Sequence, residues 1–503
     1  MKKSLGSLVA SNRKIFLVLT LVLSVAIFGT AAWKTGAKAI ISSDTARSIG
    51  AEPAGLAPPC VQDPIVTSFA DDGPGSLREA VAIACSPSTI TFASGGTITL
   101  TTGQIRIDKQ LTITGGSHAV TVSGGYNSRV FVVGFEPPRG AAPTANVTAT
   151  LNALTISEGI ASDGGGIYND FGSTLNITNS NIINNLAGSL NRDGVIESAD
   201  PGSAPTGYGG AGGGIFNAYT AVLNITDTTI DGNATSSYIY DVRPDKGNSP
   251  SSYIYGGGGI FNDGGVVHLT TSTVSNNSSL SGNGGGIYNL GAFARSERPS
   301  DAELPGTLDV VTSTISGNST YPVRRGAAPE GSPGSGGGIF NDYGYVGVYN
   351  STITNNQAAL SGAGIFDLTY AQMGTAGTPN STNGEFLGVI IFSSIVAANN
   401  YAELKILPSD VYSNQAFLSQ GYNLIGNAGT NAADFTFTAD QAGTPESPID
   451  PMLDELTDNG GPTDTHAPVT GLPRTEGAEI IAVSPAIDKG KAFTQYDQRG
   501  DPF

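Results

Sequence analysis

The chain has 503 residues, with 69 Gly and 28 Pro, and its 24 Lys and Arg against 42 Asp and Glu give a formal net charge of −18. Glycine does not recur at every third position, which excludes collagen, and a hydrophobic content of 39% is enough for a packed core, which argues against wholesale disorder. The negative charge argues against a nucleic-acid partner, and three scattered His (His118, His268 and His466) and two Cys argue against a zinc site or a Cys/His catalytic pair.

Residues 1–39 have the layout of a secretory signal peptide. Basic residues precede an uncharged apolar run from Ile15 to Trp33, and small residues follow it. Ala37-Lys38-Ala39 is a candidate cleavage site and Thr30-Ala31-Ala32 is another. We therefore expect export and an extracellular or cell-surface location. The alternative is an uncleaved membrane anchor, because the run is close to the ~20 residues that span a bilayer.

A linker (40–62) and an N-terminal cap (63–95) are expected next. In an oxidising compartment Cys60 and Cys85 can form a disulfide, with two free thiols as the alternative. A short helix is predicted over 76–84, where Ser76 and Glu79 form a capping box. Its apolar face can cover the open first coil of a repeat structure.

Two short patterns alternate through the middle of the chain. The first is Gly-Gly-Gly-Ile-Tyr/Phe-Asn, and its copies begin at Gly164, Gly212, Gly257, Gly284, Gly336 and, in a weaker form, Gly362. The second is Ser/Thr-x-Ile/Val-x-x-Asn, and its copies span Ser180–Asn185, Thr228–Asn233, Ser272–Asn277, Ser313–Asn318, Ser351–Asn356 and a drifted Ser393–Asn399.

The shortest period is 26 or 27 residues, as from Ile260 to Ile287, which is room for at least two short strands and two corners. Parallel stacking at about 4.8 Å per coil places Ile on Ile inside, Gly at corners that need a positive φ, and Asn on Asn in an amide ladder. No repeat has helical periodicity. The pattern predicts a parallel β-helix over 63–400. A leucine-rich repeat is disfavoured, because the repeats are poor in Leu and each carries a second, Gly-rich strand.

Three regions resemble bacterial secreted β-helix proteins. Asp71 to Ala80 is similar to the CSLREA motif, with Gly75 in place of its Cys. The repeats resemble the Gly-Gly-Ala-Ile and Phe-x-x-Asn units of the chlamydial polymorphic outer-membrane protein class. The C-terminal region, 401–503, resembles the choice-of-anchor Q region in Asp450–Leu453, Asp458–Thr463, His466, Ser484–Asp488 and Asp497–Gly500. The resemblance implies a right-handed coil, export, and a class mostly without an assigned reaction.

Insertions lengthen the repeats at two corners, in 191–210, 235–255 and 320–335 at one and in 291–306 and 371–386 at the other. All seven basic residues between 150 and 400 lie in them. The candidate ligand-binding residues are Tyr238, Tyr240, Arg243, Tyr253, Tyr255, Arg324 and Arg325. Tyr, Ser, Gly and Arg are typical of contact surfaces, and insertions on one face of a solenoid often bind. Solvated loops are the alternative.

An aromatic residue follows the Ile of each first pattern, at Tyr168, Phe216, Phe261, Tyr288, Phe340 and Phe366. Strand alternation places it on the face opposite the Ile. Such a row of rings can stack on sugars. The favoured interpretation is that insertions cover the rings or that the corner turns them inward.

Weak catalytic candidates are Asp170, Asp263 and Asp342, which follow the repeat Asn in alternate copies. Alternate coils separate them by roughly 9.6 Å, at the far edge of the range for an inverting carboxylate pair. Arg243, with Asp241 and Asp245, is the one lyase-like cluster. The alternative for the aspartates is a simple exposed turn. Calcium is a weak cofactor candidate, since no EF-hand loop occurs; no other cofactor or metal is expected.

These observations favour an exported surface or extracellular protein, adhesin-like or structural, that binds an extracellular glycan or surface protein through its insertions. We expect membrane contact only through an uncleaved N-terminal segment. The alternative is a carbohydrate-active enzyme, either a polysaccharide lyase or a glycoside hydrolase, which would need convergent carboxylates or a carboxylate–Arg site on one face. A passive stalk or coat without a ligand is a third hypothesis.

Overall fold

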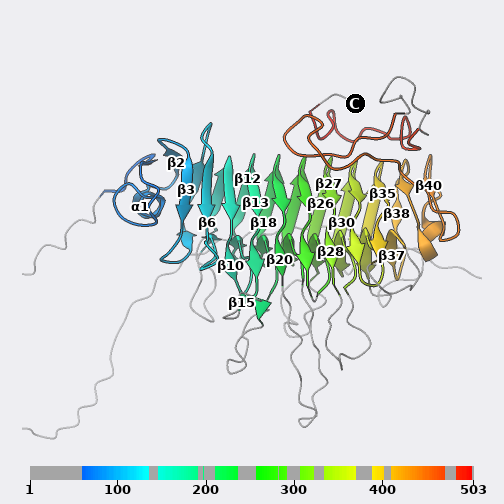
Figure 1. Ribbon diagram of the computed structural model, residues 1–503, viewed down its shortest axis with the longest axis horizontal. Helices are drawn as coiled ribbons and strands as arrows, with labels where there is room; N and C mark the ends of the chain where they lie inside the picture. Colours follow the sequence, from blue (N-terminus) through cyan, green and yellow to red (C-terminus); the bar gives the residue numbers. More distant parts are fainter. Residues whose placement is uncertain are drawn as a thin grey trace, which may run out of the picture. The chain divides into compact units, whose positions relative to one another are not determined.

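The computed structural model describes residues 59–134, 146–190, 196–197, 210–235, 256–280, 282–291, 306–321, 334–369, 388–401, 409–470 and 483–500. These residues wind into successive coils that form four parallel sheets, here numbered I to IV in the order in which each coil passes through them. The predicted right-handed parallel β-helix is confirmed (Figure 1). The signal-peptide residues lie outside the described residues.

Sheets I and II have eleven strands each. Sheet I consists of β1 (Ile65–Val66), β2 (Ser88–Phe92), β5 (Leu111–Thr114), β8 (Thr148–Asn152), β12 (Thr174–Thr178), β18 (Val222–Thr226), β22 (Val266–Thr270), β26 (Thr307–Val311), β30 (Tyr345–Tyr349), β34 (Gly388–Phe392) and β38 (Leu418–Ser419). Sheet II consists of β3 (Gly96–Thr99), β6 (Val120–Ser123), β9 (Leu154–Ser157), β13 (Asn181–Ile183), β19 (Thr229–Asp231), β23 (Thr273–Ser275), β27 (Thr314–Ser316), β31 (Thr352–Thr354), β35 (Ile395–Ala397), β39 (Leu424–Ile425) and β40 (Gln441–Ala442).

Sheets III and IV have seven and nine strands. Sheet III consists of β10 (Ile160–Ala161), β14 (Leu186–Ala187), β20 (Ala234–Thr235), β24 (Ser278–Ser279), β28 (Ser319–Thr320), β32 (Gln357–Ala358) and β36 (Asn400–Tyr401). Sheet IV consists of β4 (Ile105–Ile107), β7 (Phe131–Val133), β11 (Ile167–Asn169), β17 (Ile215–Asn217), β21 (Ile260–Asp263), β25 (Ile287–Leu290), β29 (Ile339–Asp342), β33 (Ile365–Leu368) and β37 (Val411–Ser413). A separate antiparallel pair joins β15 (Ser189–Leu190) to β16 (Ile196–Glu197).

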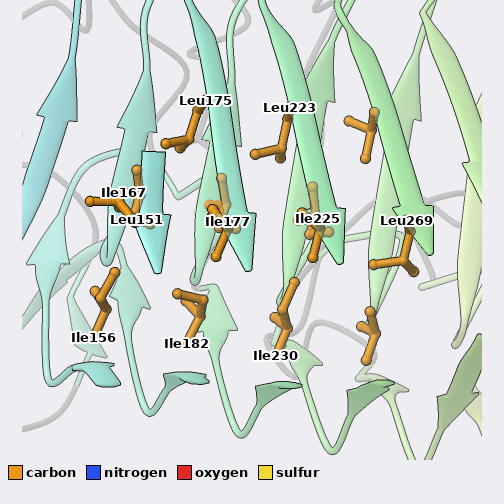
Figure 2. Packing of buried hydrophobic residues seen from close by; sticks show 14 of the residues in the cluster. Leu151, Ile156, Ile167, Leu175, Ile177, Ile182, Leu223, Ile225, Ile230 and Leu269 are labelled. Atoms are coloured by element: carbon orange, nitrogen blue, oxygen red, sulfur yellow. The ribbon is translucent and has the colours of Figure 1, made fainter. Parts of the chain in front are cut away.

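The interior is a set of aliphatic rows that run from coil to coil. Leu175 lies in register with Leu223, and Ile177 with Ile225, so each inward residue packs on its counterpart in the next coil (Figure 2). Ile182 of sheet II closes the same interior, and all these side chains are fully buried or nearly so. Alternation in the strands therefore produces one continuous core, as the Ile repeat predicts.

Most of the described corners of the repeat region contain a residue with left-handed backbone. At the corner between sheets II and III it is the residue just before the repeat Asn, such as Asn184 (φ 55°) or Asn276 (φ 52°). In the Gly triplets it is the first Gly, such as Gly257 (φ 69°). The next two glycines are needed for a different reason: a Cβ on Gly259 would lie 2.8 Å from the carbonyl oxygen of Gly286 in the following coil.

Two Asn ladders run along the coil axis, as the sequence predicts. One contains the Asn of the Gly pattern, in the order Asn169, Asn217, Asn262, Asn289, Asn341 and Asp367. The other contains the Asn of the second pattern, in the order Asn185, Asn233, Asn277, Asn318, Asn356, Asn399 and Asp410. Each Nδ2 donates to the next side-chain oxygen at 2.7–2.9 Å. The ladders satisfy buried amides that would otherwise destabilise the corners.

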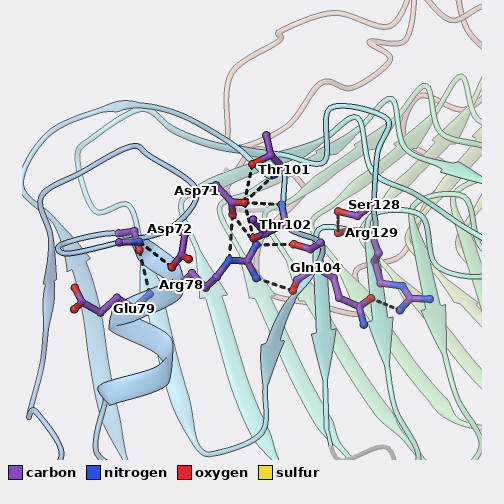
Figure 3. Close-up of polar contacts among 12 residues, drawn as sticks. Asp71, Asp72, Arg78, Glu79, Thr101, Thr102, Gln104, Ser128 and Arg129 are labelled. Atoms are coloured by element: carbon purple, nitrogen blue, oxygen red, sulfur yellow. Dashed lines mark hydrogen bonds and ion pairs between the residues drawn. The ribbon is translucent and has the colours of Figure 1, made fainter.

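The N-terminal cap contains the predicted helix, α1 (Leu77–Ile83), in which Ser76 accepts a hydrogen bond from the Glu79 N–H. Cys60 and Cys85 form a disulfide, so the cap begins inside the expected linker. Asp71 pairs with Arg78 at 2.6 Å and also accepts hydrogen bonds from the first coil (Figure 3). The helix is thereby fixed over the open end of the core.

The solenoid does not end at residue 400, where the sequence predicts its boundary. Strands β37 to β40 add further turns, followed by a 3₁₀ helix, η4 (Gly429–Asp434). These turns have no Gly triplet, which is why the repeat pattern misses them. Phe417 and Phe435 pack against each other and against the core at this end.

The C-terminal region then turns back over sheet II. We call residues 450–470 and 483–500 the strap, which is the orange and red trace beside β27 and β35 in Figure 1. Gln498 is buried, accepts a hydrogen bond from the Thr314 hydroxyl, and donates to Thr273 Oγ1 and to the Ser272 carbonyl. His466 Nε2 lies 2.8 Å from Ser316 Oγ. Gln498 and His466 thus hold the strap on the solenoid.

Candidate functional site

The outer face of sheet IV is the candidate site, because the variable segments of the chain attach at its two edges. From β8 to β36, sheet I connects to sheet II, and sheet II to sheet III, through one or two residues. The connections into and out of sheet IV range from two residues, as between β21 and β22, to the long insertions. Length variation is therefore confined to the surroundings of one sheet.

Seven aromatic rings form a column on this face: Tyr168, Phe216, Phe261, Tyr288, Phe340, Phe366 and Tyr412. Neighbouring ring centroids are 4.8–5.3 Å apart. Six of the rings, all but Tyr412, belong to a cluster separate from the aliphatic core, so these rings point outward, yet the central ones are buried. The sequence predicts six of the rings. It misses Tyr412, because this ring follows an aliphatic residue, Val411, that has no Gly triplet before it.

The ring faces are directed along the coil axis and contact each other. Tyr168 and Phe216 are nearly parallel, with an interplanar angle of 2°, and Arg129 lies over the Tyr168 ring at 5.0 Å. Internal rings therefore offer edges outward, while sugar stacking needs a free ring face. The hypothesis that this row stacks on sugars is wrong for the interior of the column.

The three candidate aspartates lie one column further along the same strands. Asp263 is in register with Leu290, and Leu290 with Asp342, so the acids occupy alternate coils with an apolar residue between them. Asp170 follows Asn169, two coils before Asp263. Two coils correspond to roughly 9.6 Å along the axis. The predicted occupation of alternate coils is observed, and the coil that contains Leu290 separates Asp263 from Asp342.

Each aspartate is held in a local contact. The Tyr288 hydroxyl donates to Asp342 Oδ2 at 2.7 Å, and burial raises the pKa of the Asp342 carboxyl to about 6. Asp170 Oδ1 accepts the Phe171 N–H at 2.8 Å, and Asp263 is only 5% exposed. These acids are part of the packed outer layer rather than solvated turn residues.

Sequence reasoning missed a fourth acid, Asp163. Of the six residues that stand just before a copy of the Gly pattern, Asp163 is the only acidic one, and this difference from the other copies is visible in the sequence. Burial, together with a smaller contribution from the charge of Asp263, raises the pKa of the Asp163 carboxyl to about 7. The Ala211 N–H donates to Asp163 Oδ1, and Arg129 donates to the Asp163 carbonyl oxygen.

Arg129 brings a positive charge to this end of the aromatic column. Its guanidinium donates to Gln104 Oε1 at 2.5 Å as well as to Asp163, and Figure 3 shows it directed toward Gln104. Asp163, Arg129 and Tyr168 form a polar group at this end of the face. It can donate and accept hydrogen bonds, and near neutral pH the Asp163 carboxyl is partly protonated.

Several predicted residues cannot be placed. Tyr238, Tyr240, Arg243, Tyr253, Tyr255, Arg324 and Arg325 lie outside the described residues, as do Asp241 and Asp245. In the described ranges, no group of three or more His, Cys, Asp and Glu is arranged to hold a metal ion. None of the helices described is long and apolar enough to cross a membrane.

Comparisons with known proteins give a similarity of structure. No protein-family model matches the chain, and no curated protein matches it. Among solved structures the chain is similar to that of Jun a 1, the major allergen from cedar pollen, with a TM-score of 0.25 and 14% sequence identity. The match covers 77% of this chain and 81% of the allergen. No functional property is transferred from it.

Proposed function

We propose that this protein is an exported surface or extracellular β-helix, adhesin-like or structural, that binds an extracellular glycan or surface protein. The carrying observation is that the insertions attach only at the edges of sheet IV. In a solenoid the repeats form the scaffold, and insertions on one face often form the binding surface. The short, uniform corners elsewhere provide a rigid frame for such a surface.

Two features support export. The Cys60–Cys85 disulfide closes the N-terminal cap, and disulfides persist in oxidising compartments. The N-terminal sequence, with its basic start and apolar run, is typical of a secretory signal.

Catalysis by the three aspartates is disfavoured, because most glycoside hydrolases need two carboxyl groups that converge on one bond. Asp263 and Asp342 are instead separated by the coil that contains Leu290. One observation keeps a carbohydrate-active enzyme as the second candidate function. Asp163 and Asp342 have raised pKa values of about 7 and about 6, and a general acid needs such a carboxyl.

The decisive experiment shortens one insertion to a corner that the protein already uses. Thr235 is in register with Ser279, and Ile260 with Ile287, so the four residues Leu280 to Asn283 can replace 236–256 without changing the register. The full and shortened chains are tested on neutral glycans, polyuronates and surface-protein extracts, with and without calcium. Retention and new reducing or unsaturated ends are both measured.

Retention that is lost in the shortened chain, without cleavage, supports the proposal. A matched control shortens 292–305 at the other edge, to the two-residue length found between Asp263 and Val266. Cleavage that disappears in Asp163→Asn or Asp342→Asn would establish the enzyme. Unchanged retention in both shortened chains would exclude the insertions as the binding surface.

A further inference from the structure

The first six long strands of sheet I present a face with an unusual composition. The outward residues of β2, β5, β8, β12, β18 and β22 number sixteen, of which ten are Thr and three are Asn. The others are Val222, Val266 and His268, so none of these sixteen is Lys, Arg, Asp or Glu. All sixteen are partly or fully exposed. A solvated β-face usually carries charges, which keep sheets soluble and apart.

The polar groups of this face are held in place by one another. Asn224 donates to Asn176 at 2.8 Å, and Asn176 donates to Thr150 at 3.3 Å. In the adjacent row the Thr114 hydroxyl donates to Asn152 Oδ1 at 2.8 Å, and Asn152 Nδ2 donates to the Thr178 hydroxyl at 2.6 Å. Because coils repeat at about 4.8 Å and outward residues at about 6.7 Å along a strand, the face is a preorganised lattice of hydroxyls and amides.

Sheet II shows what such a face can bind. Its outward rows are also rich in Thr and Ser, and in the coils of β23 and β27 the strap covers them. The contacts are hydrogen bonds between neutral groups, such as the Thr314 hydroxyl with the Gln498 amide and the Thr273 hydroxyl with the Asp464 carbonyl. Outward hydroxyl rows of this solenoid therefore bind neutral polar groups of a chain laid along them.

We propose that the uncharged face of sheet I docks a neutral polysaccharide. Thr hydroxyls and Asn amides both donate and accept hydrogen bonds, as sugar hydroxyls do. The regular repeat of the lattice suits a polymer that presents hydroxyls at regular intervals. A chain with a net charge of −18 repels polyanions, and the one ionisable side chain among the sixteen, His268, pairs with Asp309 Oδ2 at 2.9 Å.

The face of sheet I is distinct from the insertions at sheet IV, so this inference can fail or succeed independently of the proposed function. The test variant is Asn176→Lys with Asn224→Lys, which places two charges at the centre of the lattice. The matched control is Thr97→Lys with Thr121→Lys, at outward positions of sheet II that the strap leaves exposed. Circular dichroism and the unfolding midpoint establish that both variants fold.

The probes are microcrystalline cellulose, chitin and starch, with polygalacturonate and alginate as anionic comparisons. We expect retention of the full chain on at least one neutral polymer, with little dependence on salt because no ion pair is involved. The Asn176/Asn224 variant should bind about tenfold more weakly or worse, while the control stays within about twofold.

Other outcomes overturn the inference. These are no retention on any neutral polymer, retention only on polyanions, or equal losses in variant and control. Loss of retention only when 236–256 is shortened assigns glycan binding to the insertions and leaves this face without a role. Inhibition of ice recrystallisation without polysaccharide retention assigns the lattice to ice instead.

Discussion

Asn399 and Asp410 end the longer Asn ladder through two hydrogen bonds to one oxygen. The Asn399 backbone N–H and side-chain amide donate to Asp410 Oδ1 at 2.7 and 2.8 Å, and the Asn427 N–H donates to Asp410 Oδ2. Every Asn in the ladder needs an acceptor ahead of it, and the last position has only donors around it. The other ladder ends in the same way, where Asn341 donates to Asp367.

Replacing Asp410 with Asn should destabilise the protein, although the change is nearly isosteric. One of the two acceptor oxygens becomes an NH₂ group that faces an N–H of Asn399 or Asn427. We expect a loss of about 1–3 kcal/mol, measured by the midpoint of denaturant unfolding. The control is Asp488→Asn, at an exposed site. Equal midpoints for the two variants would contradict the acceptor requirement.

The opposite exchange tests the interior of the same ladder. Asn277 donates to Asn318 Oδ1 and to the Ile230 carbonyl, both at 2.9 Å. In Asn277→Asp a carboxylate oxygen faces these two acceptors in a buried site, so we expect a loss of about 3 kcal/mol or more at pH 7. Because burial favours the protonated acid, the loss should shrink as the pH is lowered toward 5. Full stability at pH 7 would show that the ladder amides are dispensable.

Asp342 predicts a pH dependence with a definite sign. Burial raises the pKa of its carboxyl from 3.8 to about 6, so between about pH 4 and pH 6 the folded chain binds more protons than the unfolded one. Its contribution to the free energy of unfolding therefore falls as the pH rises through this window and is level above it.

Asp342→Asn keeps an acceptor for the Tyr288 hydroxyl and removes the titration. Relative to wild type, the variant should gain about 2 kcal/mol in unfolding free energy between pH 4 and pH 7. The measurement is a series of denaturant midpoints for both chains across this range. Parallel pH profiles would contradict the assignment of this pKa.

The sequence predicts the architecture well because the interior repeats. Ile at a fixed spacing, Asn at a fixed offset and Gly at the corners are local signals, and stacking turns them into sheets and ladders. No local sequence signal of this kind predicts the path of the strap. Gln498 and Thr314 are 184 residues apart, and no local pattern at either residue indicates that their side chains form a hydrogen bond. Asp163 is hidden for a related reason, because its raised pKa arises from packing between coils.

The Gly triplets predict a position-dependent cost of added methyl groups. A Cβ on Gly258 would lie 2.6 Å from the Ser278 backbone nitrogen and closer still to the Gly285 carbonyl oxygen. We expect Gly258→Ala to cost about 1–3 kcal/mol through overpacking. The sixth copy carries Ala363 at the same place in the triplet, so Ala363→Gly is the matched control, with an expected cost of about 1 kcal/mol or less. Unfolding midpoints compare them, and tolerance of Ala at 258 would mean that coils can separate locally.

Gln498 should control whether the strap stays on sheet II. Its side chain is buried and fills both roles of an amide, accepting from Thr314 and donating to Thr273 and Thr463. Gln498→Glu replaces the Nε2 donor with an oxygen that faces the oxygens of Thr273 and Thr463. These hydrogen bonds are then lost, so we expect the strap to detach while the solenoid stays folded. Hydrogen exchange then rises in strap residues 463–466, and far-UV circular dichroism is unchanged.

A matched change at the strap surface, Arg499→Gln, removes an exposed ion pair with Asp497 and should leave exchange as in wild type. The core of each coil is complete without the strap, since the aliphatic cluster contains no strap residue. If Gln498→Glu unfolds the solenoid cooperatively instead, the strap is part of the folding unit, and the hydroxyl rows of sheet II are structural rather than a docking surface.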